Sequence, residues 1–183
     1  TPADLCRAMG LELEPETVAI LSRNPTPSQL LDELMVRGLH VDAVRYLAHA
    51  LPKRESVCWG CMTIRKLVEA GGSDAERRAL STARDWLREP SDERARLAGE
   101  AGQGSAQGTA AGMLALAVFF AGSNIGPNPE QTVKPPDNVT GALIAGLISV
   151  SISAGDPTGL TKRYGNCLRK GIRLARSEAR PKA

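Results

Sequence analysis

Aromatic residues are scarce in this sequence, with two Trp, two Tyr and two Phe making up 3% of the 183 residues. The apolar share still reaches 42%, which is normal for a globular protein, and Ala, Leu, Val and Ile supply most of it. The distance between packed helices depends on the size of the side chains at their contact. A core of small aliphatic side chains therefore favours closely packed helices.

Cysteines are also few, numbering four, and only one pair of them is closely spaced. Cys58 and Cys61 form a C-x-x-C pair, which can be a redox dithiol or half of a zinc site. Pro52 places Cys58 nearly two turns inside a predicted helix, where the helix dipole stabilises a thiolate little. No second close pair of zinc ligands exists elsewhere in the chain. The prediction is two packing thiols, with no metal and no cofactor.

The sequence lacks a recognisable catalytic motif. The two histidines, His40 and His49, are nine residues apart, and no short motif joins either of them to a carboxylate or a nucleophile. The glycine-rich runs 99–112 and 122–126 do not follow a strand and do not end in the Gly-Lys-Ser/Thr of a phosphate loop. No catalytic residue is assigned, and an enzyme whose site is assembled from dispersed residues stays an alternative.

Long apolar runs are missing as well. The two longest, 110–121 and 139–154, are shorter than the roughly eighteen residues that a membrane-spanning helix needs. The chain does not open with a cationic leader, an apolar stretch and a cleavage site. We therefore expect a reduced, cytoplasmic protein that does not contact a membrane.

Helix start signals, by contrast, are frequent. Thr26, Pro27 and Gln29 fit the N-cap, the first-turn proline and the capping-box partner of a helix over 27–37. Ser73 and Glu76 form a second capping box. Apolar residues at offsets of three and four continue the helical pattern after Asp42, after Pro52 and up to Pro90, and further helices are predicted at 92–101, 110–121, 139–154 and 158–179. The sequence predicts an all-α fold of about eight to nine helices.

The length fits one domain of ordinary size. We predict a single compact helical array over 1–183, with an N-terminal arm at 1–26 and a basic C-terminal helix at 158–183. The glycine-rich stretch 102–108 reads as a flexible connection. The stretch 122–138, with four prolines and two glycines, predicts a long loop over the surface.

Positive charge is concentrated at the end of the chain. The net charge is +3, but residues 160–183 hold eight Lys or Arg and one acid, so they carry +7 and the remainder carries −4. The arginines Arg169, Arg173, Arg176 and Arg180 recur at offsets of four, three and four and so project from one face of a helix. This face could bind an acidic protein or nucleic acid, or be simply solvated.

A second group of charged residues begins the helix that follows Pro52. Lys53 and Arg54 occupy the first turn, where the helix dipole favours anions, and Glu55 comes next. A nearby acid, such as Glu55 or one on the preceding helix, could compensate the two cations, and so could a bound anion. We take these three residues as candidate contact residues.

Several ordered segments resemble a family of small uncharacterised bacterial helical proteins. The resemblance rests on Asp42-Ala43, Tyr46-Leu47-Ala48, Leu51-Pro52-Lys53-Arg54-Glu55-Ser56-Val57, Trp59, Cys61, Ala83 to Pro90 with Trp86, Phe119-Phe120-Ala121-Gly122 and Val139-Thr140-Gly141. It covers most of residues 27–154. Cys58 stands where the family pattern has an aromatic residue, so the resemblance implies a packing role for this cysteine. It implies no known reaction, and family members are similar to accessory proteins found near bacterial type VI secretion genes.

These observations favour a non-enzymatic protein–protein interaction module, an adaptor or accessory protein, over an enzyme. The expected partner is an unidentified protein of acidic character. The alternative is a nucleic-acid-binding protein that uses the basic C-terminal helix, although that helix has few aromatic residues for stacking on bases.

Overall fold

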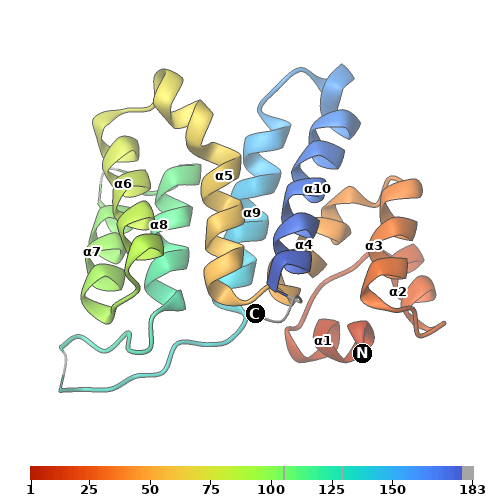
Figure 1. Ribbon diagram of the computed structural model, residues 1–183, viewed down its shortest axis with the longest axis horizontal. Coiled ribbons are helices and arrows are strands. Elements are labelled where there is room, and N and C mark those ends of the chain that lie inside the picture. Colours follow the sequence, from red (N-terminus) through yellow and green to blue (C-terminus); the bar gives the residue numbers. More distant parts are fainter. Residues whose placement is uncertain (105, 129, 179–183) are drawn as a thin grey trace.

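The computed structural model describes residues 1–104, 106–128 and 130–178 (Figure 1). These residues form ten α-helices, one 3₁₀-helix and no strand, which confirms the predicted all-α array. The elements are α1 (Pro2–Ala8), α2 (Pro15–Leu21), α3 (Pro27–Val36), α4 (His40–Ala50), α5 (Lys53–Gly71), α6 (Asp74–Arg88), α7 (Asp92–Gln103), α8 (Ala110–Ala121), α9 (Val139–Ser153), η1 (Pro157–Gly159) and α10 (Leu160–Glu178).

The number of helices is ten rather than eight or nine because the arm at 1–26 itself contains α1 and α2. Each has seven residues and begins with a proline in its first turn. A helix of two turns shows too few apolar positions for a periodic pattern, so the sequence analysis did not find them. Among the described residues, no helix combines the length and the apolar composition needed to cross a membrane.

The predicted capping boxes are confirmed. The Thr26 hydroxyl accepts from the Gln29 backbone N–H, and the Gln29 side chain accepts from the Thr26 N–H at 2.9 Å. Ser73 and Glu76 make the same reciprocal pair at the start of α6. These bonds satisfy backbone donors that the first helical turn leaves unpaired, which is why both helices start where the sequence predicts.

The two most apolar helices, α8 and α9, lie at the centre of the array (Figure 1). α8 packs against α5, α6, α7 and α9, while α9 packs against α4, α5, α8 and α10. Leu114, Ile144 and Leu147 are fully buried between these helices. A helix that is apolar on all sides is stable in water when other elements cover most of its surface, and here only a small part of α9, including Val150, stays exposed.

α10 docks onto the core through Trp59 of α5. The Trp59 ring is fully buried, and its indole N–H donates to the backbone oxygen of Cys167 at 3.0 Å. Gly171 lets the helix approach this closely, since a Cβ atom at this position would lie 2.8 Å from the ring. The basic C-terminal helix is therefore an integral part of the array.

The arm is attached to α4 by one buried carboxylate. Asp42 is 1% exposed, and it accepts from the Glu14 backbone N–H at 2.8 Å and from the Thr17 hydroxyl at 2.6 Å. Arg45 pairs with the same carboxylate at 3.3 Å. Asp42 thus lies in the first turn of α4, two residues after its start.

Of the two predicted irregular segments, the connection at 102–108 is shorter than expected and the loop at 122–138 is as expected. The connection is shorter than 102–108, because α7 continues to Gln103 and buries Gly102 against α8. The prediction of a long loop at 122–138 is confirmed, since its described residues, 122–128 and 130–138, contain no helix. Within it, the Asn124 side chain accepts from the backbone N–H groups of Gly126 at 2.8 Å and Val133 at 2.9 Å, which folds part of the loop onto itself.

Candidate functional site

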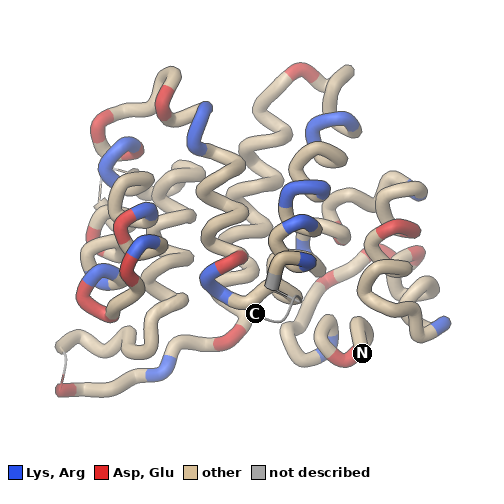
Figure 2. Tube along the Cα trace, viewed as in Figure 1, with Lys and Arg blue, Asp and Glu red and all other residues tan. Residues whose placement is uncertain are grey.

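Basic residues recur along α10 (Figure 2). Arg169, Arg173 and Arg176 are exposed, as their spacing predicts, whereas Arg180 lies outside the described residues. Arg169 Nη2 donates to Asn166 Oδ1 at 2.6 Å, and Arg173 Nε donates to the backbone oxygen of Arg169 at 3.3 Å. These contacts stay within the helix and leave the cations facing solvent.

The opposite side of α10 holds it on the domain. Leu168 is fully buried, Tyr164 is buried, and Ile172 packs against the core. The Tyr164 ring stacks on His40 of α4, with the ring centroids 5.5 Å apart. The helix therefore presents its arginines on a rigidly docked support, not on a free end.

The cations of α10 differ from those in the rest of the chain in their pairing. Most lysines and arginines before α10 form an ion pair with a carboxylate, as Arg37 does with Glu16 and Glu33. Among the described side chains, no carboxylate is within ion-pair distance of any cation of α10. We call the row of Arg169, Arg173 and Arg176 the basic face.

The second predicted group has partners inside the molecule. Lys53 Nζ donates to the backbone oxygen of Phe120 at 3.2 Å, and Arg54 Nη2 donates to that of Leu87 at 2.7 Å. Both oxygens belong to the last turns of their helices, α8 and α6, where unpaired carbonyls and the helix dipole favour a cation. Glu55 Oε1 lies 3.9 Å from Arg54 Nη1. This explains why two cations begin α5: they stabilise the ends of its neighbours.

The cysteines have the character of packing residues. Cys61 is buried, Cys58 is half-buried, and both are free thiols. Burial raises the pKa of both thiols, whereas a reactive cysteine needs a lowered pKa.

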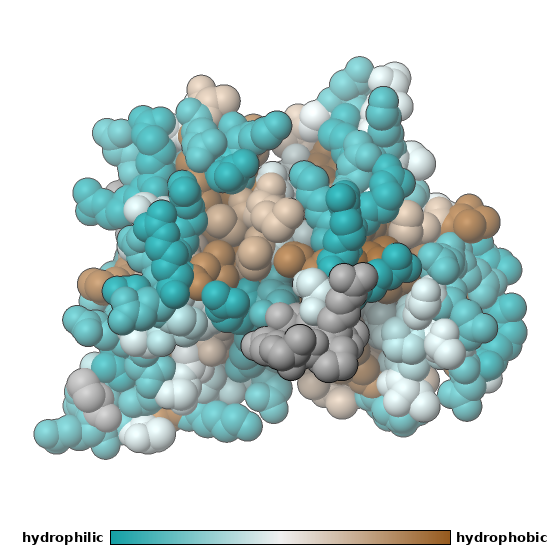
Figure 3. Space-filling view, viewed as in Figure 1, coloured by the Kyte–Doolittle hydropathy of each residue, from teal (hydrophilic) through white to brown (hydrophobic). Residues whose placement is uncertain are grey.

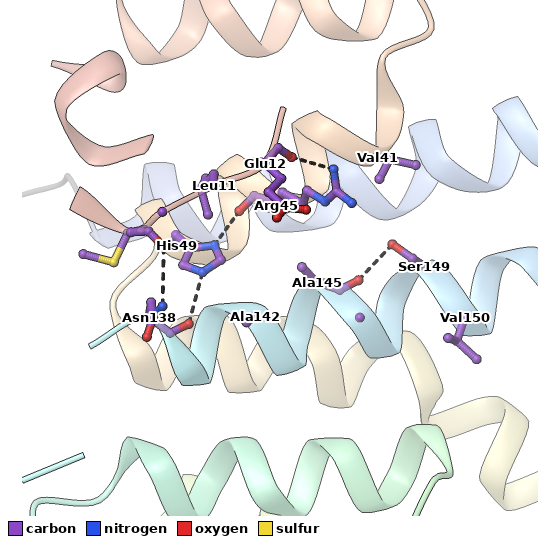
Figure 4. A pocket seen from close by; sticks show the side chains of 13 residues that line it. Leu11, Glu12, Val41, Arg45, His49, Asn138, Ala142, Ala145, Ser149 and Val150 are labelled. Atoms are coloured by element: carbon purple, nitrogen blue, oxygen red, sulfur yellow. Dashed lines mark hydrogen bonds between the residues drawn. The ribbon is translucent and has the colours of Figure 1, made fainter. Parts of the chain in front are cut away.

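A groove of about 480 Å³ runs between the arm, α4 and α9 (Figure 4). The polar group at one end is His49, whose Nδ1 lies 2.8 Å from the backbone oxygen of Arg45 and whose Nε2 lies 3.1 Å from that of Asn138. Gly141 makes room for the imidazole, because a Cβ atom there would lie 2.6 Å from the ring. Both ring nitrogens thus face backbone oxygens, and His49 serves to position α9 against α4.

The rest of this groove is poor in reactive groups. Its lining on α9 is mostly small and apolar, with Ala142, Ala145 and Gly146, and Val150 is 53% exposed at its edge. The Ser149 hydroxyl donates to the backbone oxygen of Ala145 at 2.9 Å. This hydroxyl is therefore engaged within its own helix.

Sequence reasoning missed the roles of Asp42 and of the first two residues of α5. Asp42 accepts hydrogen bonds from Glu14 and Thr17, which lie 28 and 25 positions earlier in the chain. Arg54 donates to the backbone oxygen of Leu87, 33 positions later. No local pattern encodes contacts over such separations. The one available signal was electrostatic: two cations at the start of a helix indicated a nearby acid or a bound anion. The structure instead supplies carbonyl oxygens of two other helices.

Comparison with known proteins identifies a family for this chain but indicates no activity. The model of a family of unknown function, DUF6931, matches residues 30–175. This range begins inside α3 and includes most of α10. At its C-terminal end it extends beyond the sequence resemblance, which covered residues 27–154. No curated protein and no solved structure matches the chain.

Proposed function

Since the chain belongs to DUF6931, a family of unknown function, its role has to be argued from its own surface, and we propose that it is a non-enzymatic protein-interaction module. Its basic face, Arg169, Arg173 and Arg176, binds an acidic segment of a protein partner. Most of α10 lies within the residues matched by the family model.

The pairing of charges supports this proposal most. Elsewhere on the surface most cations have a carboxylate partner, but among the described residues the cations of α10 have none. A row of like charges on one helix face is mutually repulsive and destabilises the helix slightly. An acidic partner removes that repulsion and gains charge-assisted hydrogen bonds to three guanidinium groups.

A protein partner accounts for this surface better than nucleic acid does. Proteins that hold single strands combine cations with aromatic rings on which bases stack. The one aromatic residue of α10 is Tyr164, and its ring is buried against His40. The basic face therefore offers charge and hydrogen bonds, which an acidic peptide satisfies.

The sequence resemblance extends the proposal to a setting, the accessory proteins found near bacterial type VI secretion genes. The family match carries no link to secretion. The resemblance alone supports this part of the proposal, and the binding experiment below does not depend on it.

The proposal is tested by fluorescence anisotropy with two labelled probes, a glutamate-rich peptide and a single-stranded oligonucleotide of equal length. We expect saturable binding of the peptide that weakens as salt rises, since exposed charges are screened over about 10 Å at 0.1 M salt. The triple variant Arg169→Gln, Arg173→Gln, Arg176→Gln removes the face, and its affinity for the peptide should fall at least tenfold, roughly 1.4 kcal/mol.

A control variant with the same change in charge is Arg77→Gln, Arg78→Gln, Arg88→Gln on α6, where all three side chains are exposed. It should bind the peptide as the wild type does. Equal losses in the two variants would reduce the effect to net charge and contradict the proposal. Tighter binding of the oligonucleotide than of the peptide would replace the proposal with the nucleic-acid alternative.

A further inference from the structure

A smaller groove of about 210 Å³ lies where α5, the end of α9 and α10 meet. Figure 3 shows apolar side chains gathered between α5 and α10, with hydrophilic ones along both borders. The lining includes Thr63, Ser151 and Cys167 and two cations, Arg163 and Lys170. No carboxylate lines it.

Arg163 is held in place by one of its nitrogens and leaves another without a partner. Its Nε donates to the backbone oxygen of Ile152, in the last turn of α9, at 3.1 Å. Its Nη2 is buried and has no hydrogen-bond partner among the described residues. A buried donor left unpaired is unfavourable, and more so when the group is charged. The guanidinium is thus fixed in position beside the groove, and one of its donors is not satisfied by any described acceptor.

Lys170 supplies a second positive charge to the same groove. Arg163, Cys167 and Lys170 recur at offsets of four and three, so they share the side of α10 that faces α5. Burial raises the pKa of the Cys167 thiol, while its hydrogen bond to Thr63 and the nearby Lys170 ammonium act in the opposite direction. The groove therefore places neutral hydroxyl and thiol groups between two cations.

We propose that this groove binds an oxyanion, held by the guanidinium group of Arg163 and the ammonium group of Lys170. Guanidinium and ammonium groups together are the donors that proteins use for phosphate and carboxylate. The oxyanion is either a free phosphate or a carboxylate of a bound chain, since the two share this chemistry. The site is on a different side of α10 from the basic face, so it does not depend on the proposed function.

The test is titration of the intact protein with inorganic phosphate, followed by isothermal calorimetry and by amide NMR shifts, against sodium chloride at equal ionic strength. We expect saturable binding of phosphate with shifts centred on the last turn of α9 and on residues 163–170. Lys170→Gln should weaken binding roughly tenfold, as loss of a charge-assisted contact does. The control is Lys162→Gln, an exposed lysine of the same helix outside the groove lining, and it should bind phosphate as the wild type does.

A second variant, Arg163→Lys, keeps the charge but removes the planar group, and it should also weaken binding while its helical circular dichroism stays unchanged. Phosphate that binds no better than chloride, or equally to the wild type and Lys170→Gln, refutes the site. To identify the source, the glutamate-rich peptide is titrated in the presence of saturating phosphate. Competition that disappears in Lys170→Gln assigns the groove to a carboxylate of the peptide, and independent binding assigns it to free phosphate.

This design separates the two proposals. If the peptide does not bind but phosphate does, the proposed function fails and the oxyanion site stands. If the peptide binds through the basic face and phosphate does not bind, the proposed function stands and the oxyanion site fails.

Discussion

Gly165 and Gly171 are six residues apart on α10, yet a methyl group at each would meet different surroundings. At Gly171 a Cβ atom would lie 2.7 Å from Leu47 and 2.8 Å from the Trp59 ring. At Gly165 the nearest atom is the mobile end of Arg169, at an ordinary contact distance of 3.5 Å. Only Gly171 is required by packing.

The two alanine substitutions should therefore change stability in opposite directions. Gly165→Ala should raise the free energy of unfolding by up to about 1 kcal/mol, because alanine favours a helix over glycine. Gly171→Ala should lower it by about 1–3 kcal/mol, because the methyl group overpacks the contact with α5. Urea unfolding measures both, and an equal gain at the two positions would contradict the close approach of α10 to Trp59.

Three buried thiols determine how stability changes at alkaline pH. Burial raises the pKa of Cys6, Cys61 and Cys167 above the ordinary value of a thiol. In the unfolded chain these thiols ionise at their ordinary pKa, so between the two pKa values the folded state binds more protons. Stability is therefore fully present below the unfolded pKa, near pH 8.5–9, and is lost as the pH rises through the folded pKa.

We accordingly predict that the free energy of unfolding, measured with urea under reducing conditions, falls above about pH 9. Burial also raises the pKa of Tyr46 to about 12, which continues the loss at higher pH. In Cys167→Ala the fall with pH should be less steep than in the wild type. A profile that is flat from pH 8 to about 10.5 is the outcome that excludes this linkage.

At the scale of the element, the start of α5 stabilises helices other than its own. Lys53 and Arg54 donate to carbonyl oxygens in the last turns of α8 and α6. Because α5 runs antiparallel to both α6 and α8, its N-terminus lies beside their C-termini (Figure 1). The two cations interact unfavourably with the dipole of α5. Their favourable interaction with the C-terminal ends of α6 and α8 is larger.

Arg54→Gln should therefore lower the free energy of unfolding by about 0.5–1.5 kcal/mol, since it removes a charge-assisted bond to the end of α6. The comparison is Arg78→Gln on α6, an exposed arginine whose loss should stay within about 0.5 kcal/mol of the wild type. Chemical denaturation provides both values. If Arg54→Gln and Arg78→Gln lower the free energy of unfolding equally, the bond from Arg54 to the Leu87 oxygen contributes nothing to stability.

At the scale of the whole molecule, several polar contacts between α4 and the arm that precedes the family match converge on one buried side chain, Asp42. The family model begins at residue 30, and α1 and α2 precede it. Asp42 accepts two hydrogen bonds from the arm and pairs with Arg45, which in turn donates to the backbone oxygen of Glu12 at 2.7 Å. Loss of Asp42 leaves the Glu14 N–H and the Thr17 hydroxyl without their acceptor.

Asp42→Ala should lower the free energy of unfolding by about 2–4 kcal/mol, because it breaks a buried, hydrogen-bonded charge. Hydrogen exchange should become faster at residues 9–21 before it changes in α8 and α9. Asp32→Ala on α3, where the carboxylate is exposed, is the control and should have little effect. Uniformly faster exchange throughout the chain would show that Asp42 supports the core as a whole and does not hold the arm alone.

The all-α fold, most helix boundaries and the exposed arginines of α10 could be predicted from the sequence, because each depends on residues within one or two turns of one another. The Thr26 and Ser73 capping boxes are such local signals. The partners of Lys53 and the buried role of Asp42 could not be predicted in this way. Their contacts join residues that only the folded chain brings together.

The sequence by itself determined that apolar helices would cluster around a shared interior, since periodic burial follows from side chains a few residues apart. Tertiary structure alone decided which charges remain unpaired. A cation looks the same in the sequence whether it faces a carbonyl oxygen of another helix, as Lys53 does, or solvent, as Arg173 does. Electrostatic partners are chosen by distance in space, and the order of residues along the chain does not record that distance.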